Sequence, residues 1–295
     1  DEILKIKSEF LKAKYLGYKF ISYIKFSLIE ADYLLSTTPN IGCRGYPLMK
    51  PKNVKNLVHV FHSISDISIY RKGSLDNYDS VILAGEFQKK SIRYLEKQRG
   101  LKTKKLYNLG VPYIDYLINK KNKLRELKNK NFNILVASSW GSKGCLRTYG
   151  IDFIKQLSSK YNVTLRPHPH SYINEKSFMS HCANELSQTN INWSKTIDPL
   201  NDLNNADLLI SDTSSIRFDY KVLYNKPVIT LSIDSSDMDG YERNYLNHDW
   251  INESDKLIGP VIYKTSFNKL NYYIEEARLN KFSDYSFSNN IIYNQ

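Results

Sequence analysis

Two histidines lie where a strand is predicted to end, in Val58-His59-Val60-Phe61-His62-Ser63. Histidine is the side chain best suited to move a proton near neutral pH. Side chains alternate along a strand, so His59 and His62 should face opposite ways, with one buried and one reaching a cleft. They are therefore poor joint metal ligands. His62, followed by a small residue, is the candidate general base that takes a proton from an attacking hydroxyl.

A second chemical signal is a junction at which a predicted strand, 207–211, is followed at once by a predicted helix, 214–223. The first N–H groups of a helix and its positive dipole end bind anions at the carboxyl edge of a parallel sheet. The hydroxyls of Ser214 and Ser215 add donors without bulk, so the junction suits a phosphate or pyrophosphate. The alternative is an ordinary helix cap formed by Asp212, Thr213 or Ser214.

The segment Arg166-Pro167-His168-Pro169-His170 follows another predicted strand. Arg166 and His168 can bind phosphate oxygens, and the flanking prolines restrict the backbone that presents His168. The alternative is a turn that contains an incidental histidine, which is the interpretation we favour for His170. His181 and His248 have no supporting context and are interpreted as surface or packing residues.

Metal-binding patterns are weak. His168-Pro169-His170 is formally HxH and Asp237-Met238-Asp239 is formally DxD, but neither has an obvious further ligand beside it, and no HExxH pattern occurs. The sequence therefore predicts neither a tightly bound catalytic metal nor a cofactor.

Length and composition limit the scaffold that positions these groups. The chain has 295 residues, of which 41% are hydrophobic, so it can fold into about two domains and is not disordered as a whole. Its three cysteines are widely spaced and odd in number, which argues against a disulfide scaffold or a cysteine-rich zinc site and favours a reducing compartment.

Short apolar runs alternate with helical patterns in two blocks, which predicts parallel sheets covered on both faces. The expected fold is α/β, with two doubly wound domains that face each other across a cleft. The basic segment 119–130 is interpreted as a helix end and linker, so the domains should comprise residues 1–130 and 131–295. A C-terminal helix over 267–279 is expected to cross back to the first domain.

The N-terminal pattern over 2–30 predicts a helix, which we interpret as a buried helix, with a membrane-surface helix as the alternative. No run approaches the ~18–20 apolar residues of a membrane span. Because the first residue is Asp1, we expect the sequence to be part of something longer. The formal charge of +12 is compatible with anionic lipid, phosphorylated substrates or nucleic acid, but the lysines are spread along the chain and no nucleic-acid-binding motif is present.

Several motifs in order resemble the CDP-glycerol glycerophosphotransferase family of teichoic-acid and capsule enzymes. They are His62-Ser63, Gly110-Val111-Pro112-Tyr113, Ser138-Ser139-Trp140-Gly141, Arg166-Pro167-His168-Pro169 and Ser211-Asp212-Thr213-Ser214-Ser215 with Phe218-Asp219. The resemblance spans about Ala31 to Tyr241. It implies a GT-B architecture, with acceptor bound by the first domain and donor by the second. It also implies metal-independent transfer of a polyol phosphate at the cytoplasmic face of the membrane.

Carried over by motif, the resemblance makes His62 the expected base and places His168 near the donor pyrophosphate. It also assigns a set of residues to donor phosphate or nucleotide binding: Arg166, Ser214, Ser215, Asp212, Thr213, Asp219 and Trp140. The sequence departs from the family at Phe61-His62-Ser63-Ile64, which replaces Trp-His-Gly-Thr, at Thr213, which replaces Tyr, and at Gly110-Val111-Pro112-Tyr113, which replaces Gly-Tyr-Pro-Arg.

The predicted function is therefore transfer of glycerol or ribitol phosphate from a CDP-activated donor to a hydroxyl of a lipid-linked, oligosaccharide or polyol-phosphate acceptor. The protein would work in the bacterial cytoplasm, bound peripherally to the anionic inner face of the membrane. An inverting glycosyltransferase that uses a nucleotide sugar on the same scaffold is the alternative enzyme, and a basic nucleic-acid-binding protein is the alternative of another class. We expect no nucleic acid as partner.

Overall fold

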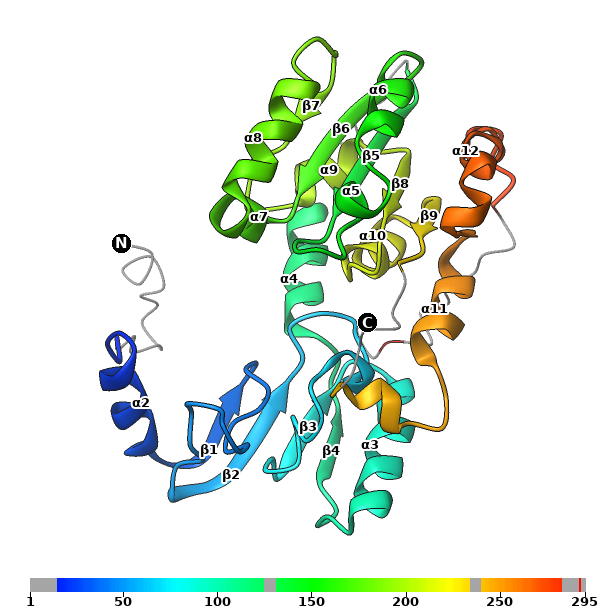
Figure 1. Cartoon of the computed structure of the whole chain (residues 1–295). Coiled ribbons are helices and arrows are strands. Elements are labelled where there is room, and N and C mark those ends of the chain that lie inside the picture. The colour runs from blue at the N-terminus through cyan, green and yellow to red at the C-terminus, as the bar shows by residue number, and fades with distance from the viewer. Residues whose placement is uncertain (1–14, 125–130, 234–239, 283–291, 293–295) are drawn as a thin grey trace.

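The structure is a computed structural model that describes residues 15–124, 131–233, 240–282 and Ile292. It contains two separate sheets whose paired strands are all parallel, which confirms the predicted α/β class. In Figure 1 the second sheet lies above the first, and helix α4 (Pro112–Lys121) stands between them. Part of the predicted linker, 125–130, lies outside the described residues.

The first sheet has four strands in chain order, so each new strand is added at the same edge. The buried residues of β2 include Val54 and the continuous run Leu57-Val58-His59. The strands are β1 (Glu30–Ser36), β2 (Asn53–Val60), β3 (Ser80–Leu83) and β4 (Lys105–Asn108). The helices of this half are α2 (Phe20–Ser27), η1 (Ile67–Ile69), α3 (Glu86–Arg99) and α4.

The second sheet has six strands in the order β10-β9-β8-β5-β6-β7. The chain therefore builds outward from β5 in one direction and then returns to build outward from β8 in the other. Such a reversal opens a crevice at the carboxyl ends of the two strands, where ligands of open α/β sheets bind. The strands are β5 (Asn133–Ser138), β6 (Asn162–Pro167), β7 (Asn192–Trp193), β8 (Leu208–Ser211), β9 (Val228–Leu231) and β10 (Val261–Ile262).

Helices surround this sheet, and most of them are short. Helix α6 (Asp152–Ser158) begins after Gly150, which adopts a φ of 75° that an α-helix does not allow. The others are α5 (Cys145–Thr148), α7 (Pro169–Asn174), α8 (Lys176–Glu185), α9 (Leu200–Asn205), α10 (Ile216–Tyr224), η2 (Glu242–Tyr245), α11 (Trp250–Ile258), η3 (Lys264–Lys269) and α12 (Leu270–Arg278).

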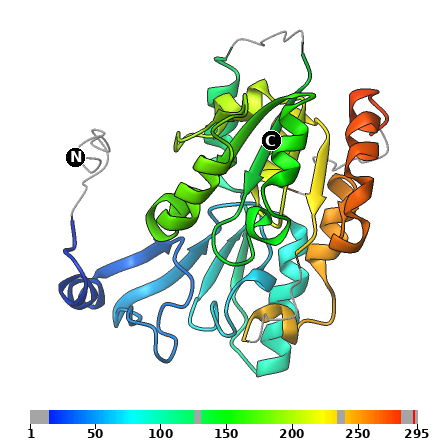
Figure 2. The same cartoon turned by 45° about the horizontal axis from the view of Figure 1, so that its top comes forward.

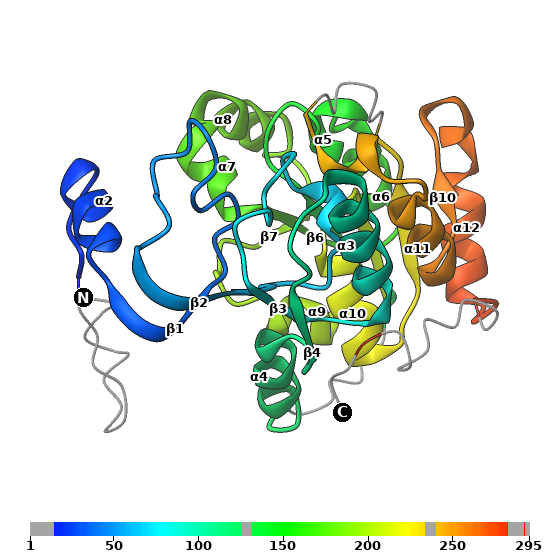
Figure 3. The ribbon, with the colours of Figure 1, turned by 90° about the horizontal axis from the view of Figure 1, so that it is seen from below.

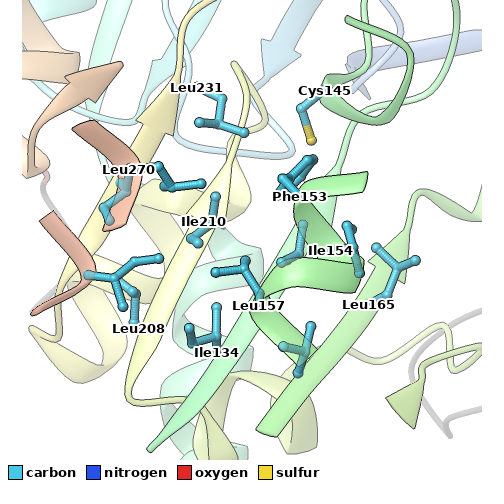
Figure 4. Packing of buried hydrophobic residues seen from close by; sticks show 14 of the residues in the cluster. Ile134, Cys145, Phe153, Ile154, Leu157, Leu165, Leu208, Ile210, Leu231 and Leu270 are labelled. Atoms are coloured by element: carbon cyan, nitrogen blue, oxygen red, sulfur yellow. The ribbon is translucent and has the colours of Figure 1, made fainter. Parts of the chain in front are cut away.

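Apolar packing holds each sheet and joins the two halves. Figure 4 shows the cluster of the second sheet, where Phe153 of α6 packs with Ile134 and Ile210 of the strands. A different cluster unites residues of both halves, among them Ile114 of α4 and Leu209 of β8. Each such side chain contributes roughly 1.5–3 kcal/mol when fully buried. The two halves thus share a continuous core.

The chain returns to the first half at a different place from the one expected. Helix α12 packs on the second sheet through Leu270 and Ile274 and does not cross. The return is made by η2 and its flanks, where Tyr245 and Leu246 pack against the apolar cluster of the first sheet. Figure 2 shows the ribbon of this region from a second side.

The prediction of a buried first helix is wrong for its described part. None of the residues of α2 is buried, and Phe20 and Leu28 are 72% and 70% exposed. Figure 3 shows α2 at one end of the molecule, far from α12. Residues 1–14 of the predicted helix lie outside the described residues.

Candidate active site

A cavity of about 1160 Å³ opens between the two halves. His62 follows β2 in the first sheet, and Trp140 and Thr213 follow β5 and β8, the two strands of the crevice in the second sheet. The cavity therefore lies at the carboxyl ends of strands from both sheets, as parallel α/β architecture predicts for a ligand site.

Of the two histidines near the end of β2, one is buried and the other reaches a cavity, as predicted, although the strand ends before His62. His59 is fully buried, its Nε2 lies 3.1 Å from the hydroxyl oxygen of Tyr70, and burial lowers its pKa to about 3. His62 lies beyond the strand end and lines the cavity. Desolvation by the surrounding protein lowers the pKa of His62 below its ordinary value. An imidazole that is neutral at physiological pH at a cavity wall has the properties of a general base.

The start of α10 forms the opposite wall. Thr213 and Ser215 line the cavity, whereas Ser214 does not. The side chain of Ser215 occupies the cap position but makes no capping hydrogen bond, so its hydroxyl is not used by the helix itself. An anion in the cavity could therefore bind to the N-terminus of the helix and to hydroxyl donors.

Asp212 lies behind this wall and organises it. Its buried carboxylate accepts hydrogen bonds from the backbone N–H groups of Ser139 and Cys145, each at 2.8 Å, and from the Ser139 hydroxyl at 2.6 Å. It also accepts from the N–H of Ser214 at 3.2 Å. The loop after β5 and the loop after β8 are thus held by one side chain. Asp212 does not line the cavity, and its hydrogen bonds position the residues that do.

Two further predicted donor residues are buried away from the cavity. The Arg166 guanidinium pairs with Asp202 at 2.6 Å and also donates to Ser194 and to the carbonyl of Ile197. Asp219 is buried, desolvation raises its pKa to about 7, and its Oδ1 has no hydrogen-bond partner among the described residues. Neither side chain lines the cavity.

His168 is half-buried beside the crevice. Its Nδ1 accepts the N–H of His170 at 3.1 Å, so in the neutral ring the proton resides on Nε2, which leaves a donor for a ligand oxygen. Its ring stacks on His170, which in turn contacts Trp140 at 5.4 Å between ring centroids. Desolvation and the neighbouring His170 lower the pKa of His168. Of this stack, Trp140 lines the cavity and His168 does not.

Comparison with known proteins identifies the family of the chain. The family model of CDP-glycerol:poly(glycerophosphate) glycerophosphotransferases matches residues 65–293. The chain belongs to this family.

Individual relatives are distant. The teichoic acid glycerol-phosphate primase of Bacillus subtilis strain 168 is 24% identical over 266 residues, which are 83% of this chain and 64% of the primase. The solved wall teichoic acid polymerase TagF is 16% identical and covers 87% of this chain and 65% of its own, with a TM-score of 0.51. The chain therefore spans slightly less than two thirds of these proteins.

A third similar structure belongs to another kind of enzyme. The UDP-GlcNAc 2-epimerase of Methanocaldococcus jannaschii, solved with UDP-GlcNAc and UDP, is 16% identical over 75% of this chain and 62% of its own. Its TM-score is 0.50. Together with TagF, it shows that the fold of this glycerophosphotransferase family member is GT-B.

The cavity of this family member contains basic side chains that sequence reasoning missed. Among the described residues, its lining includes one acidic residue, Asp255, and five Lys or Arg residues: Arg71, Lys143, Arg217, Arg243 and Lys264. None stands in a recognisable phosphate motif, and their sequence separation gives no signal that they meet. Buried Arg217 pairs with Asp255 at 2.7 Å and so is largely neutralised. The remaining positive charge favours an anionic ligand.

No three His, Cys, Asp or Glu side chains gather to hold a metal within the part of the chain that the structure describes. The formal DxD residues Asp237 and Asp239 lie outside that part. Metal independence therefore stays a prediction.

Proposed function

We propose that this chain transfers a polyol phosphate, glycerol or ribitol phosphate, from a CDP-activated donor to a hydroxyl acceptor during synthesis of a bacterial surface polymer such as teichoic acid or capsule. One observation carries the proposal: His62 of the first sheet and the start of α10 in the second sheet line the same cavity. Family membership and the likeness to the teichoic acid primase support the choice of donor.

In the proposed mechanism, His62 accepts the proton of an acceptor hydroxyl, and the freed oxygen attacks the distal phosphorus of the donor. A new P–O bond forms to the acceptor while the bond to the bridging oxygen breaks, and CMP leaves with that oxygen. The hydroxyl of Ser215 and the N-terminus of α10 stabilise the charge that develops on the phosphoryl oxygens. Positioning and electrostatics thus supply most of the rate enhancement.

Substitution of Ser215 with alanine is expected to weaken binding of CDP by about tenfold or more, since a hydrogen bond to a charged group is worth roughly 1.5–3 kcal/mol. Calorimetry with CMP and CDP measures the effect. The matched variant is Ser214→Ala. Ser214 does not line the cavity, so this substitution should weaken CDP binding less than Ser215→Ala. Equal CDP affinity in the parent, both variants and the double variant would remove the phosphate site from this helix start.

The same assay separates the donor classes. A panel of CDP-glycerol, CDP-ribitol, UDP-sugars and CMP-sugars should show binding of the CDP-polyols. Tight binding of a UDP-sugar with no binding of either CDP-polyol would instead establish the alternative glycosyltransferase.

Turnover is expected to survive chelation. With EDTA in excess, transfer should continue, with at most a modest loss if a divalent ion screens the pyrophosphate. The measurement is the initial rate of CMP release from CDP-glycerol before and after addition of EDTA. Loss of turnover that one specific divalent ion restores would show that a ligand set such as Asp237 and Asp239 was wrongly dismissed.

Peripheral association with the inner face of the cytoplasmic membrane is part of the proposal. Among the described residues, no helix is both long and apolar enough to span a bilayer. The exposed side chains of α2 and its flanks include aromatic and aliphatic groups beside Lys19 and Lys25, a composition that suits an anionic lipid surface. The large apolar ones are Tyr18, Phe20, Ile21, Ile24 and Leu28.

A further inference from the structure

Residues 240–248, here called the crossing segment, attach the second half of the chain to the first. The N–H of Lys72 donates to the carbonyl of Gly240 at 2.7 Å, and the N–H of Glu242 donates to the carbonyl of Tyr70 at 2.8 Å. Between these bonds, Arg71 and Tyr241 form an antiparallel β-bridge. The crossing segment is therefore fixed to the loop that follows η1 by its backbone.

The side chain of Glu242 anchors the crossing segment. It is fully buried, and it accepts the N–H of Gly73 at 2.8 Å and both terminal nitrogens of Arg99, one of them at 2.8 Å. Arg99 also pairs with Asp76 at 2.9 Å. Burial of a carboxylate costs free energy unless the group is paired and hydrogen-bonded. Glu242 can therefore be buried only where the crossing segment brings it to Gly73 and Arg99.

The anchor places Arg71 beside Tyr241 at the cavity. Both residues line it, and the guanidinium carbon of Arg71 lies 4.5 Å from the centroid of the Tyr241 ring. Two other arginines of the lining are neutralised, Arg217 by Asp255 and Arg243 by Asp249. Among the described residues Arg71 has no carboxylate partner, so its charge is available to a ligand.

The position of Arg71 indicates which ligand that is. Arg71 belongs to the first half, as His62 does. The two lysines of the lining, Lys143 and Lys264, which form no ion pair within the described part of the chain, follow β5 and β10 in the second half. In the proposed function, the donor phosphates lie against the second half and the reacting hydroxyl lies at His62. An anion that reaches Arg71 therefore belongs to the acceptor.

We propose that Arg71, stacked on Tyr241, binds a phosphate of the acceptor, and that Glu242 is a positioning residue that holds this pair at the cavity wall. The inference rests on the proposed function and specifies which residues would bind a phosphate-bearing acceptor such as a growing polyol-phosphate chain. A planar guanidinium matches two phosphate oxygens at once, and the aromatic ring beneath it restricts its orientation.

The test compares two acceptors with the full chain. Initial rates are measured with CDP-glycerol and either a synthetic oligo(glycerol phosphate) or free glycerol, a neutral acceptor with the same hydroxyls. For Arg71→Gln we expect the KM of the oligomer to rise by about tenfold or more, because the substitution removes one charged hydrogen-bonding group. Its kcat at saturation, the rate with glycerol and the affinity for CDP should stay close to those of the parent.

Lys72→Gln is the matched control, because it removes the same charge one residue away and its side chain does not line the cavity. It should leave the KM of the oligomer unchanged. Glu242→Gln should raise that KM in the same direction as Arg71→Gln without weakening CDP binding, which a general loss of stability would not do selectively. If Glu242→Gln fails to fold, the Arg71 and Lys72 variants still decide the question.

Binding of the oligomer alone, measured by calorimetry, distinguishes this inference from the proposed function. A parent that binds oligo(glycerol phosphate), with at least tenfold weaker binding in Arg71→Gln, supports the acceptor site even if CDP-glycerol is not the donor. An unchanged KM and affinity in Arg71→Gln would overturn the inference while leaving the proposed transfer intact. A loss of CDP affinity in Arg71→Gln would assign the residue to the donor and overturn it as well.

Discussion

His62→Ala is expected to lower kcat by about 10²–10⁴-fold, the usual effect of removing a general base. Affinity for CDP should stay nearly unchanged, because the phosphate-binding wall belongs to the second half of the chain. Single-turnover rates with CDP-glycerol and calorimetry with CDP measure the two quantities. Replacement of His168 should behave differently and weaken donor binding as well as turnover, because the family resemblance assigns this residue to the donor pyrophosphate and the bond to His170 uses only its Nδ1, which leaves Nε2–H as a donor.

The pH dependence of kcat is part of the same prediction. A general base works in its neutral form, and desolvation lowers the pKa of His62 below its ordinary 6.5. Activity should therefore persist below that pH and fall only as the pH drops through the lowered pKa. The acidic limb should vanish in His62→Ala.

Two outcomes would contradict this assignment. Loss of CDP affinity in His62→Ala, together with its retention in His168→Ala, would show that the two roles are reversed. An unfolded His62→Ala protein would indicate a structural histidine, although that role is already filled by buried His59, which contacts Tyr70. A thermal melt of each variant separates loss of the base from loss of the fold.

The sequence was sufficient to predict the central strands of the second sheet because they are short and strongly apolar. All four residues of Leu208–Ser211 are buried, as expected of an internal strand, and the helices between such strands favour parallel pairing. The expectation that one of His59 and His62 is buried and the other reaches a cleft is confirmed, although β2 ends at Val60, before His62. These inferences depend on neighbouring residues and not on distant contacts.

The contacts of individual polar residues could not be predicted where the partner is distant in sequence. Arg166 looks like a phosphate ligand at a strand end, yet Asp202, on α9, neutralises it. Conversely, no local pattern brings Arg71 to Tyr241, because their contact depends on the crossing segment and on the Arg99–Glu242 pair. Helix α2 was mistaken for a buried element because apolar periodicity does not reveal whether another surface covers it.

Replacement of Asp212 should have the second largest effect among the predictions. The motif that contains Asp212 can be recognised from neighbouring residues, but its contacts also involve residues distant in sequence. Its carboxylate accepts hydrogen bonds from N–H groups of the loop after β5 as well as from the N–H of Ser214. An amide at this position has one acceptor oxygen. In Asp212→Asn the NH₂ group must therefore face at least one backbone N–H donor of the two loops.

We expect Asp212→Asn to lower the free energy of unfolding by about 2–4 kcal/mol, since a buried group left unsatisfied costs roughly 1–3 kcal/mol and hydrogen bonds to a charged group are lost as well. Affinity for CDP should fall too, because the loops that carry Trp140 and Ser215 lose their common support. Denaturant unfolding and calorimetry measure the two effects.

Asp207→Asn is the matched control for this prediction. Asp207 stands at the opposite end of β8 and accepts the N–H of Asn133 at 2.9 Å, so it also joins the segments of β5 and β8. Its replacement should cost about 1 kcal/mol of stability, the usual worth of one hydrogen bond, and leave CDP affinity intact. If both variants lose stability equally and neither loses CDP affinity, Asp212 supports the sheet but does not organise the donor wall. If only Asp212→Asn loses affinity, the carboxyl end of β8 is the place where the fold and the site depend on the same side chain.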